Sequence, residues 1–165
     1  MVAIIFGVSG AGKTTIGKRL AQELGWHFYE ADDFHPQPNI DKMRNGVPLT
    51  DDDRWPWLES LREAVKRSLA AGEHAVLACS ALKEDYRRCL RVNDKVELVF
   101  LRGDYEVVAD QLRKRRRHFM NPALLQTQFA DLEEPQPVEA AVVIELGRSP
   151  RELIQDIKRK LRIRR

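Results

Sequence analysis

The sequence has few cysteines and no long apolar run, and both absences narrow the classes of protein to consider. Its two cysteines, Cys79 and Cys89, are too few for a disulfide framework or a metal cluster, and we expect buried or half-buried thiols of a reduced compartment. No apolar stretch approaches the roughly 20 residues that a membrane-spanning helix needs. Residues 1–7 carry neither a basic leader nor a cleavage-site pattern. We therefore expect a cytoplasmic protein.

Internal repeats and low-complexity tracts are also absent. The 165 residues are 43% hydrophobic and 32% charged, which is typical of a soluble globular protein and argues against wholesale disorder. A chain of this length buries about 70% of the surface that it exposes when unfolded. We therefore expect a single domain over residues 1–165.

The net charge of +3 is mild, but the charged residues are unevenly distributed. Residues 1–82 contain 9 basic and 11 acidic side chains, whereas residues 83–165 contain 19 basic and 14 acidic ones. Nucleic-acid-binding proteins can show such a distribution. So can an enzyme that holds a metal ion with one half and a polyphosphate with the other, and composition leaves both possibilities open.

Short apolar runs alternate with segments of helical spacing along the chain. The apolar runs predict strands over residues 2–6, 26–30, 75–79, 96–101 and 140–146. Helical spacing, caps and stop signals predict helices over residues 13–24, 36–46, 51–72, 81–91, 105–116, 122–132 and 150–161. Strands separated by helices indicate an α/β fold, with a parallel sheet covered by helices on both faces. The segment 133–137 is expected to be a connector within this domain.

One motif points directly to chemistry. It fits the P-loop pattern G-x-x-x-x-G-K-[ST] between a predicted strand and a predicted helix. Its glycines let the backbone turn tightly and direct N–H groups toward phosphates, at the positive end of the following helix. Lys13 would reach the β- and γ-phosphates of a nucleoside triphosphate, and the Thr14 hydroxyl would bind Mg²⁺. The alternative is a glycine-rich turn with an exposed lysine. The motif consists of Gly7, Val8, Ser9, Gly10, Ala11, Gly12, Lys13 and Thr14.

Carboxylates follow the second predicted strand, at Glu30, Asp32 and Asp33. Ligands of a parallel sheet gather at the carboxyl ends of its strands, which places these side chains near the γ-phosphate. One carboxylate there would accept the proton of an attacking hydroxyl, and another would hold the metal through water. The alternative is that Asp32 and Asp33 cap a helix or a turn.

Several longer segments resemble the gluconokinase family of small P-loop kinases, which are similar to shikimate kinases. The P-loop is shared with many nucleotide-binding proteins, whereas residues 35–36 (His-Pro), 48–57 (Pro-Leu-x-Asp-x-Asp-Arg-x-Pro-Trp) and 79–83 (Cys-Ser-Ala-Leu-Lys) are much more specific. The matches span residues 5–135, about four-fifths of the chain. The resemblance implies a P-loop kinase fold with a five-stranded parallel sheet and a mobile lid. It also implies transfer of the γ-phosphoryl group of ATP to the 6-hydroxyl of D-gluconate, which yields 6-phosphogluconate and ADP.

The same resemblance assigns roles to individual residues. It implies a substrate-binding segment over residues 32–57 and a lid over residues 113–129. The implied catalytic residues are Lys13, Asp32 as the base, and Arg115. The implied substrate-binding residues are Asp32, His35, Asn39, Lys42, Arg54, Ser80, Lys83 and His118. The sequence departs from the family at Arg117, where glycine is usual, and at Glu30, where aspartate is common.

Elementary chemistry supports Arg54 as the residue that binds the acid group of the substrate. A planar guanidinium suits a carboxylate because it can donate two parallel hydrogen bonds. The alternative for Arg54 is an ion pair on the surface of its helix, and for Lys42 a solvated lysine. His35 would either contact the substrate or only fix a turn with Pro36. We expect packing roles for the side chains of Trp55, Trp57 and Cys79.

The strongest basic cluster spans residues 113–117. As part of a lid it would exclude water and place an arginine, best matched by Arg115, against the charge of the transition state. The alternative is a solvated basic face. The basic residues 158–165 are expected to form a frayed, solvated helix end.

Two other functions remain as alternatives. One is a kinase of another small hydroxy acid, such as shikimate. The other is a P-loop nucleic-acid-binding protein, although the basic segments lack interleaved aromatic residues and the acidic residues 51–53 would repel a nucleic-acid backbone. We expect a small-molecule substrate and no nucleic-acid or membrane partner. Members of the family are often dimers, so a homodimer is one option, although no segment of the sequence indicates an interface.

Overall fold

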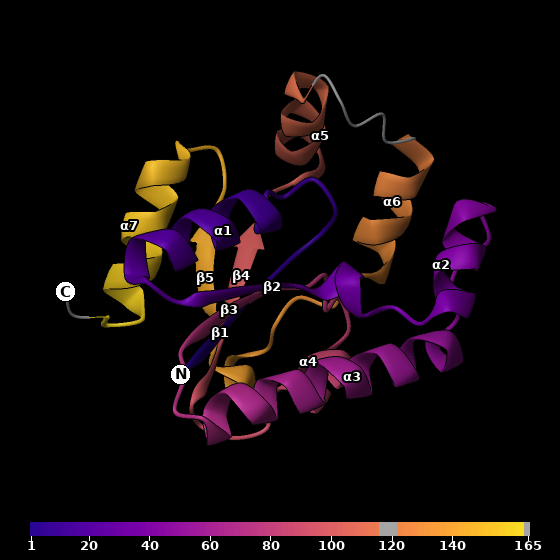
Figure 1. Cartoon of the computed structure of the whole chain (residues 1–165). Coiled ribbons are helices and arrows are strands. Elements are labelled where there is room, and N and C mark those ends of the chain that lie inside the picture. Colours follow the sequence, from indigo (N-terminus) through magenta and orange to yellow (C-terminus); the bar gives the residue numbers. More distant parts are fainter. Residues whose placement is uncertain (116–121, 164–165) are drawn as a thin grey trace.

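A sheet of five parallel strands forms the centre of the computed structural model, which describes residues 1–115 and 122–163 (Figure 1). The strands lie in the order β2-β3-β1-β4-β5, and all neighbours are parallel. The P-loop follows the central strand, at the point where the strand order changes direction and where ligands of such sheets bind. The bounds are β1 (Val2–Phe6), β2 (His27–Glu30), β3 (Ala75–Ala78), β4 (Val96–Arg102) and β5 (Val142–Glu145).

Helices cover both faces of the sheet, with α1 and α7 on one face and α3 and α4 on the other (Figure 1). The central strand shows why: Ala3 and Ile5 pack toward α1 and α7, whereas Ile4 and Phe6 pack toward α3. Among the described residues, no helix combines the length and the apolar character that a membrane crossing requires. The α-helices are α1 (Lys13–Leu24), α2 (Gln37–Arg44), α3 (Asp51–Ala70), α4 (Glu84–Leu90), α5 (Tyr105–Lys114), α6 (Pro122–Asp131) and α7 (Pro150–Lys160). Two 3₁₀-helices are η1 (Ala31–Phe34) and η2 (Pro137–Glu139).

The expected α/β architecture is confirmed, with small shifts at the ends of elements. Two segments next to strands differ from the sequence-based prediction. The helix expected from residue 81 begins only at Glu84, because residues 79–83 form a loop in which Ala81 has a φ of +38°. Asp32 and Asp33 lie in η1, a 3₁₀-helix that the sequence did not lead us to predict. Both segments lie at the carboxyl ends of strands.

The start of α3 is fixed by a complete capping box. Thr50 Oγ1 accepts a hydrogen bond from the backbone N–H of Asp53 at 3.1 Å, and an Asp53 carboxylate oxygen accepts one from the backbone N–H of Thr50 at 2.9 Å. Three acidic side chains in the first turn also favour the positive end of the helix. The first turn of α3, which carries Asp51 and Arg54, is therefore held in a defined orientation.

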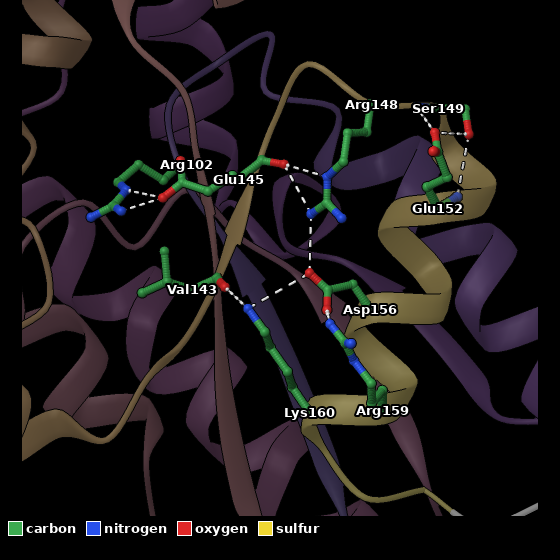
Figure 2. A network of polar contacts seen from close by, with 9 residues as sticks. All are labelled: Arg102, Val143, Glu145, Arg148, Ser149, Glu152, Asp156, Arg159 and Lys160. Carbon is green, nitrogen blue, oxygen red and sulfur yellow. Dashed lines mark hydrogen bonds and ion pairs between the residues drawn. The ribbon is translucent and has the colours of Figure 1, made fainter.

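The edge strand β5 is covered by side chains from α7 and the residues before it (Figure 2). Lys160 Nζ donates to the carbonyl of Val143 at 2.7 Å, and the Arg148 guanidinium donates to the carbonyl of Glu145 at 3.2 Å. Asp156 accepts a hydrogen bond from Arg148 at 3.0 Å and lies 3.6 Å from Lys160 Nζ. These contacts satisfy carbonyls that an edge strand would otherwise offer to another chain.

The basic end of α7 differs from the expected frayed helix end. Lys158 pairs with Glu23 of α1, and Arg159 pairs with Asp156 of its own helix. The helix continues to Lys160, and the basic side chains of its last turn have acidic or carbonyl partners. The last part of the expected segment, residues 164–165, lies outside the described residues.

Candidate active site

The P-loop connects β1 to α1. Two of its glycines have backbone conformations or surroundings that disfavour any residue with a side chain. Gly10 and Gly12 have φ values of +86° and +96°, which residues with a side chain rarely adopt. A Cβ atom on Gly10 would lie 2.6 Å from the side chain of Leu112 in α5. Gly12 is the N-cap residue of α1, so the positive end of this helix begins at the loop.

Lys13 is the first residue of α1, and its side chain turns back over the loop. Its Nζ donates a hydrogen bond to the carbonyl of Val8 at 3.0 Å. Burial lowers the pKa of Lys13, while the nearby carboxylates of Asp32 and Glu30 act in the opposite direction. The ammonium thus bonds to the P-loop and is subject to the charge of carboxylates at the end of β2 and the start of η1.

Thr14 and Glu30 supply oxygen atoms of the kind that Mg²⁺ prefers. Thr14 Oγ1 donates a hydrogen bond to Glu30 Oε2 at 2.5 Å. Within the described residues there is no group of three or more His, Cys, Asp or Glu side chains that could hold a metal ion. In nucleotide sites Mg²⁺ takes one or two protein ligands and completes its shell with phosphate oxygens and water. A hydroxyl and a carboxylate side by side fit that requirement.

A cavity of about 660 Å³ lies at this end of the sheet and gathers most of the predicted site. Its volume lies within the range of small-molecule sites. Predicted site residues in its wall are Ser9, Gly10, Gly12, Lys13, Thr14, Asp32, His35, Arg54, Ser80, Lys83 and Arg115. The other members of the motif are buried and not part of the wall: Gly7, Val8 and Ala11.

Arg115, just after α5, and Gln128 of α6 come from the segment expected to form a lid, and both lie close to the P-loop. Arg115 follows α5 and places Nη2 3.5 Å from the position that a Cβ on Gly12 would occupy. Gln128 of α6 accepts hydrogen bonds from the backbone N–H and the hydroxyl of Ser9, both at 3.2 Å. Gln128 was not among the predicted site residues, although it belongs to the segment that resembles the family. The predicted residue His118 lies outside the described residues.

Asp32 and His35 lie in the part of the wall formed by η1 and the residue after it. The His35 ring stacks on Trp57, with ring centroids 4.4 Å apart, and the Trp57 indole donates to the carbonyl of Ala31 at 2.7 Å. Burial lowers the pKa of His35, and the carboxylate of Asp32 acts against this shift. His35 is therefore fixed by packing and also lies in the cavity wall. Trp57 is 3% exposed, as expected of a packing residue.

Asn39 and Lys42 are not in the cavity wall, because their polar groups are directed to α3. Asn39 Nδ2 donates to the carbonyl of Asp53 at 2.8 Å and lies 3.3 Å from Nδ1 of His35. Lys42 Nζ donates to both carboxylate oxygens of Asp53, at 2.8 and 2.9 Å. In this structure both residues join α2 to the start of α3 within the segment 32–57, away from the cavity wall.

Arg54, Lys83 and Tyr86 reach the wall beside one another. Arg54 Nη1 lies 3.4 Å from the Tyr86 hydroxyl and 3.8 Å from Asp51 Oδ1. The surface ion pair considered for Arg54 is thus present, yet the same guanidinium lines the cavity. Lys83 Nζ donates to the two carboxylate oxygens of Asp51 at 3.0 and 3.1 Å. Neither Asp51 nor Tyr86 was among the predicted site residues.

The loop of residues 79–83 is held by Arg87, a buried arginine that the sequence analysis did not assign to the site. Arg87 Nη1 donates to the carbonyls of Ala81 and Leu82, both at 3.0 Å. Its Nε and Nη2 donate to the carboxylate of Glu139, at 2.6 and 3.0 Å. These bonds stabilise the left-handed conformation of Ala81. Arg87 and Glu139 are 52 positions apart, so no local pattern indicates the pair.

Cys79 has the packing role expected from the sequence. The side chain is 1% exposed, and burial raises the pKa of its thiol to about 12. A thiol with this pKa stays protonated near neutral pH and is a poor nucleophile.

Comparisons with known proteins agree with this geometry. A family model described as shikimate kinase matches residues 9–162. A gluconokinase of Arabidopsis thaliana is 45% identical over 170 residues, which cover 94% of this chain and 89% of that protein. The chain belongs to the gluconokinase family.

Two solved structures place this gluconokinase family member among known folds. A gluconokinase from Sinorhizobium meliloti shares 41% identity and a TM-score of 0.85, with 94% of this chain and 87% of that chain covered. A sugar kinase from a Janibacter species shares 44% identity and a TM-score of 0.89, with 98% and 94% covered. The expected P-loop kinase fold is confirmed. The chain is a phosphotransferase, and ATP is its phosphoryl donor.

Proposed function

We propose that this enzyme transfers the γ-phosphoryl group of ATP to the 6-hydroxyl of D-gluconate, which yields 6-phosphogluconate and ADP. The observation that carries the proposal is one cavity whose wall contains the ammonium of Lys13, the carboxylate of Asp32 and the guanidinium of Arg54. The reaction needs these three groups: a cation for the phosphates, a proton acceptor for the hydroxyl and a cation for the acid group. The relatives named gluconokinase support a sugar acid as the acceptor.

The donor half of the reaction would take place on the P-loop. The loop amides and Lys13 would hold the β- and γ-phosphates, at the positive end of α1. Thr14 and Glu30 would hold Mg²⁺, which when bound neutralises charge on the phosphates. Arg115 lies close to Gly12 and would stabilise the charge that develops on the transferred group.

Asp32 is the proposed base for the acceptor. It would take the proton of the 6-hydroxyl while the hydroxyl oxygen forms its bond to the γ-phosphorus. The bond from the γ-phosphorus to the bridging oxygen breaks, and the electron pair leaves with ADP. Arg54 and Lys83 would bind the carboxylate of gluconate, and His35 and Ser80 are in the same wall to contact its hydroxyl groups.

The proposed substrate-binding segment and the proposed lid supply groups to the acceptor side and the donor side of the cavity, respectively. Residues 32–57 contribute acceptor-side groups to the wall, and residues 113–129 contribute Arg115 and Gln128 near the P-loop. We propose that the second segment is the lid that excludes water during transfer, with His118 as one of its substrate contacts.

A coupled assay for ADP release tests the proposed function. The enzyme is incubated with Mg·ATP and, separately, gluconate, other sugar acids, shikimate, nucleoside monophosphates or no acceptor. Gluconate-dependent ADP release, with 6-phosphogluconate identified as product, is the expected result. Release that depends on another acceptor would overturn the gluconate assignment while keeping the kinase.

We also propose that the enzyme is cytoplasmic and has no nucleic-acid or membrane partner; a homodimer is one option for its assembly. Its acidic and basic groups meet in a cavity of small-molecule size. Light scattering after size exclusion measures the oligomeric state, and a filter-binding assay at low salt tests for RNA or DNA binding. Tight binding that weakens steeply with salt would contradict the absence of a nucleic-acid partner.

A further inference from the structure

Asp51 is the meeting point of three side chains that come from two parts of the chain. Lys83 Nζ contacts both of its carboxylate oxygens, at 3.0 and 3.1 Å, and the Tyr86 hydroxyl donates a short hydrogen bond to Oδ1. Arg54, one turn further along α3, lies 3.8 Å from the same Oδ1. Asp51 therefore links the first turn of α3 to the loop before α4 and to α4 itself.

The hydrogen-bond directions form a chain that ends at Asp51. Because the Tyr86 hydroxyl donates its only proton to Asp51, it can only accept from Arg54 Nη1 at 3.4 Å. The hydrogen bond from Tyr86, followed by the one from Lys83, lowers the pKa of Asp51, so the carboxylate is ionised near neutral pH. An ionised carboxylate can only accept, which fixes the direction of every bond in the chain.

The three partners of Asp51 line the cavity, whereas Asp51 does not. The Asp51 side chain is half exposed, so it holds these groups from the solvent side. Lys83 uses at most two of its three ammonium protons on Asp51. In the described part of the chain, Arg54 makes only long contacts, to Tyr86 and Asp51. Donors on both cations therefore stay available for a ligand. Within this chain of contacts two cations face the one carboxylate of Asp51, which favours an anionic ligand, while Asp131 in the cavity wall is a further carboxylate that acts on Lys83.

We propose that Asp51 is a positioning residue for the carboxylate of the acceptor. It holds Lys83 directly, and Arg54 through Tyr86, in the orientation that binds the acid group. Long flexible side chains lose much conformational freedom when they bind, and a partner that orders them beforehand reduces this loss on binding. The inference rests on the proposed function, because it needs an acid acceptor in this part of the cavity.

Asp51→Asn and Asp52→Asn form a matched pair to test the role. Both residues are exposed in the first turn of α3, so both variants lose the same charge near the positive end of the helix. Asp52 is not in the cavity wall and is not part of the chain of contacts to Lys83 and Tyr86. We expect Asp51→Asn to raise the KM for gluconate by roughly 10-fold and to leave the KM for ATP within about 2-fold. Asp52→Asn is expected to match wild type in both constants.

A double-mutant cycle with Tyr86→Phe shows whether Asp51 acts through Tyr86. If it does, the KM for gluconate in the double variant rises by less than the product of the two single effects. A merely structural role of Asp51 would change kcat and both KM values together. An unchanged or lowered KM for gluconate in Asp51→Asn, or equal effects of Asp51→Asn and Asp52→Asn, would overturn the proposal.

If the proposed function is wrong, the wild-type enzyme shows it in the choice of acceptor, independently of the Asp51 variants. If wild type uses another acid and not gluconate, the gluconate assignment fails and the same comparison is made with the KM for that acid. A wild-type enzyme that uses only acceptors without an acid group overturns both proposals.

Discussion

Asp32 is the side chain whose loss should separate the chemical step from ATP binding. Asp32→Asn keeps the shape of the side chain but removes the proton acceptor, so we expect kcat to fall by about 10²–10⁴-fold while the Kd for ATP is largely unchanged. Asp33→Asn is the matched control, because Asp33 is the next residue of η1 and is not in the cavity wall. Steady-state kinetics and an ATP titration measure the two quantities. A collapse of ATP affinity would instead identify Asp32 as a metal-binding or structural residue.

Arg54 should affect the acid acceptor and not the nucleotide. Removal of a charge-assisted contact in Arg54→Ala is expected to raise the KM for gluconate by about 10–100-fold and to change the KM for ATP much less. Arg67→Ala serves as the control, since Arg67 is exposed in the last turn of the same helix and away from the wall. If the two variants have the same KM for gluconate, Arg54 is only the surface partner of Asp51.

The residues that sequence could predict are those whose role follows from a local pattern or from family segments. The P-loop is one, since its glycines and Lys13 are consecutive in the chain. Asn39 shows where such reasoning stops: its amide was expected to face substrate, and the structure directs it to the carbonyl of Asp53. The buried pair Arg87–Glu139 was beyond reach, because only the folded chain brings these residues together.

The helices and strands also divide into those that a local pattern predicts and those that depend on contacts between distant residues. Apolar runs and helical spacing predicted the strands and helices, because strands buried on both faces are continuously apolar and helices that cover a sheet repeat apolar residues with the helical period. The start of α4 could not be predicted in this way. The carbonyl of Leu82 accepts from Arg87 and from the backbone N–H of Glu133 at 2.9 Å, and these bonds hold residues 79–83 as a loop.

Asp156 joins α7 to the edge of the sheet and should contribute to stability. It is 7% exposed and accepts hydrogen bonds from Arg148 and Arg159. In Asp156→Asn these cations lose their charged partner, so we expect the free energy of unfolding at pH 7 to fall by about 1–3 kcal/mol. Urea titration measures it. Glu63→Gln is the control: it breaks the exposed Glu63–Lys66 pair on α3 and should leave the free energy of unfolding almost unchanged.

The effect of Asp156 should also depend on pH with a defined sign. The hydrogen bond from Arg159, assisted by Arg148, lowers the pKa of Asp156 from 3.8 to about 2. A lowered pKa means that the stabilisation is complete above pH 3.8 and is lost as the pH falls toward 2. The difference between wild type and Asp156→Asn should therefore shrink over this interval in a series of urea titrations. A difference that stays constant from pH 5 to pH 2.5 would contradict the ionic role of Asp156.

The folded chain brings acidic and basic side chains from both halves of the sequence into one cavity, although the basic residues are concentrated in the second half. The acidic first half supplies Asp32 and Glu30 but also the P-loop Lys13, and the basic second half supplies Lys83 and Arg115. A division into a metal-binding half and a polyphosphate-binding half, as composition allowed, is therefore too simple. The cations proposed to bind the phosphates and the acid group come from both halves and line one cavity.

A cavity built from both halves implies that ligand binding stabilises the whole domain. A ligand that binds only the folded chain adds about 2.7 kcal/mol to the free energy of unfolding at 100 times its Kd. For a domain of this size we expect Mg·ATP at that concentration to raise Tm by about 5–11 °C in a thermal melt. Lys13→Ala should abolish most of this shift and all turnover, because it removes the cation of the P-loop. An equal rise of Tm in Lys13→Ala would mean that ATP binds away from the P-loop.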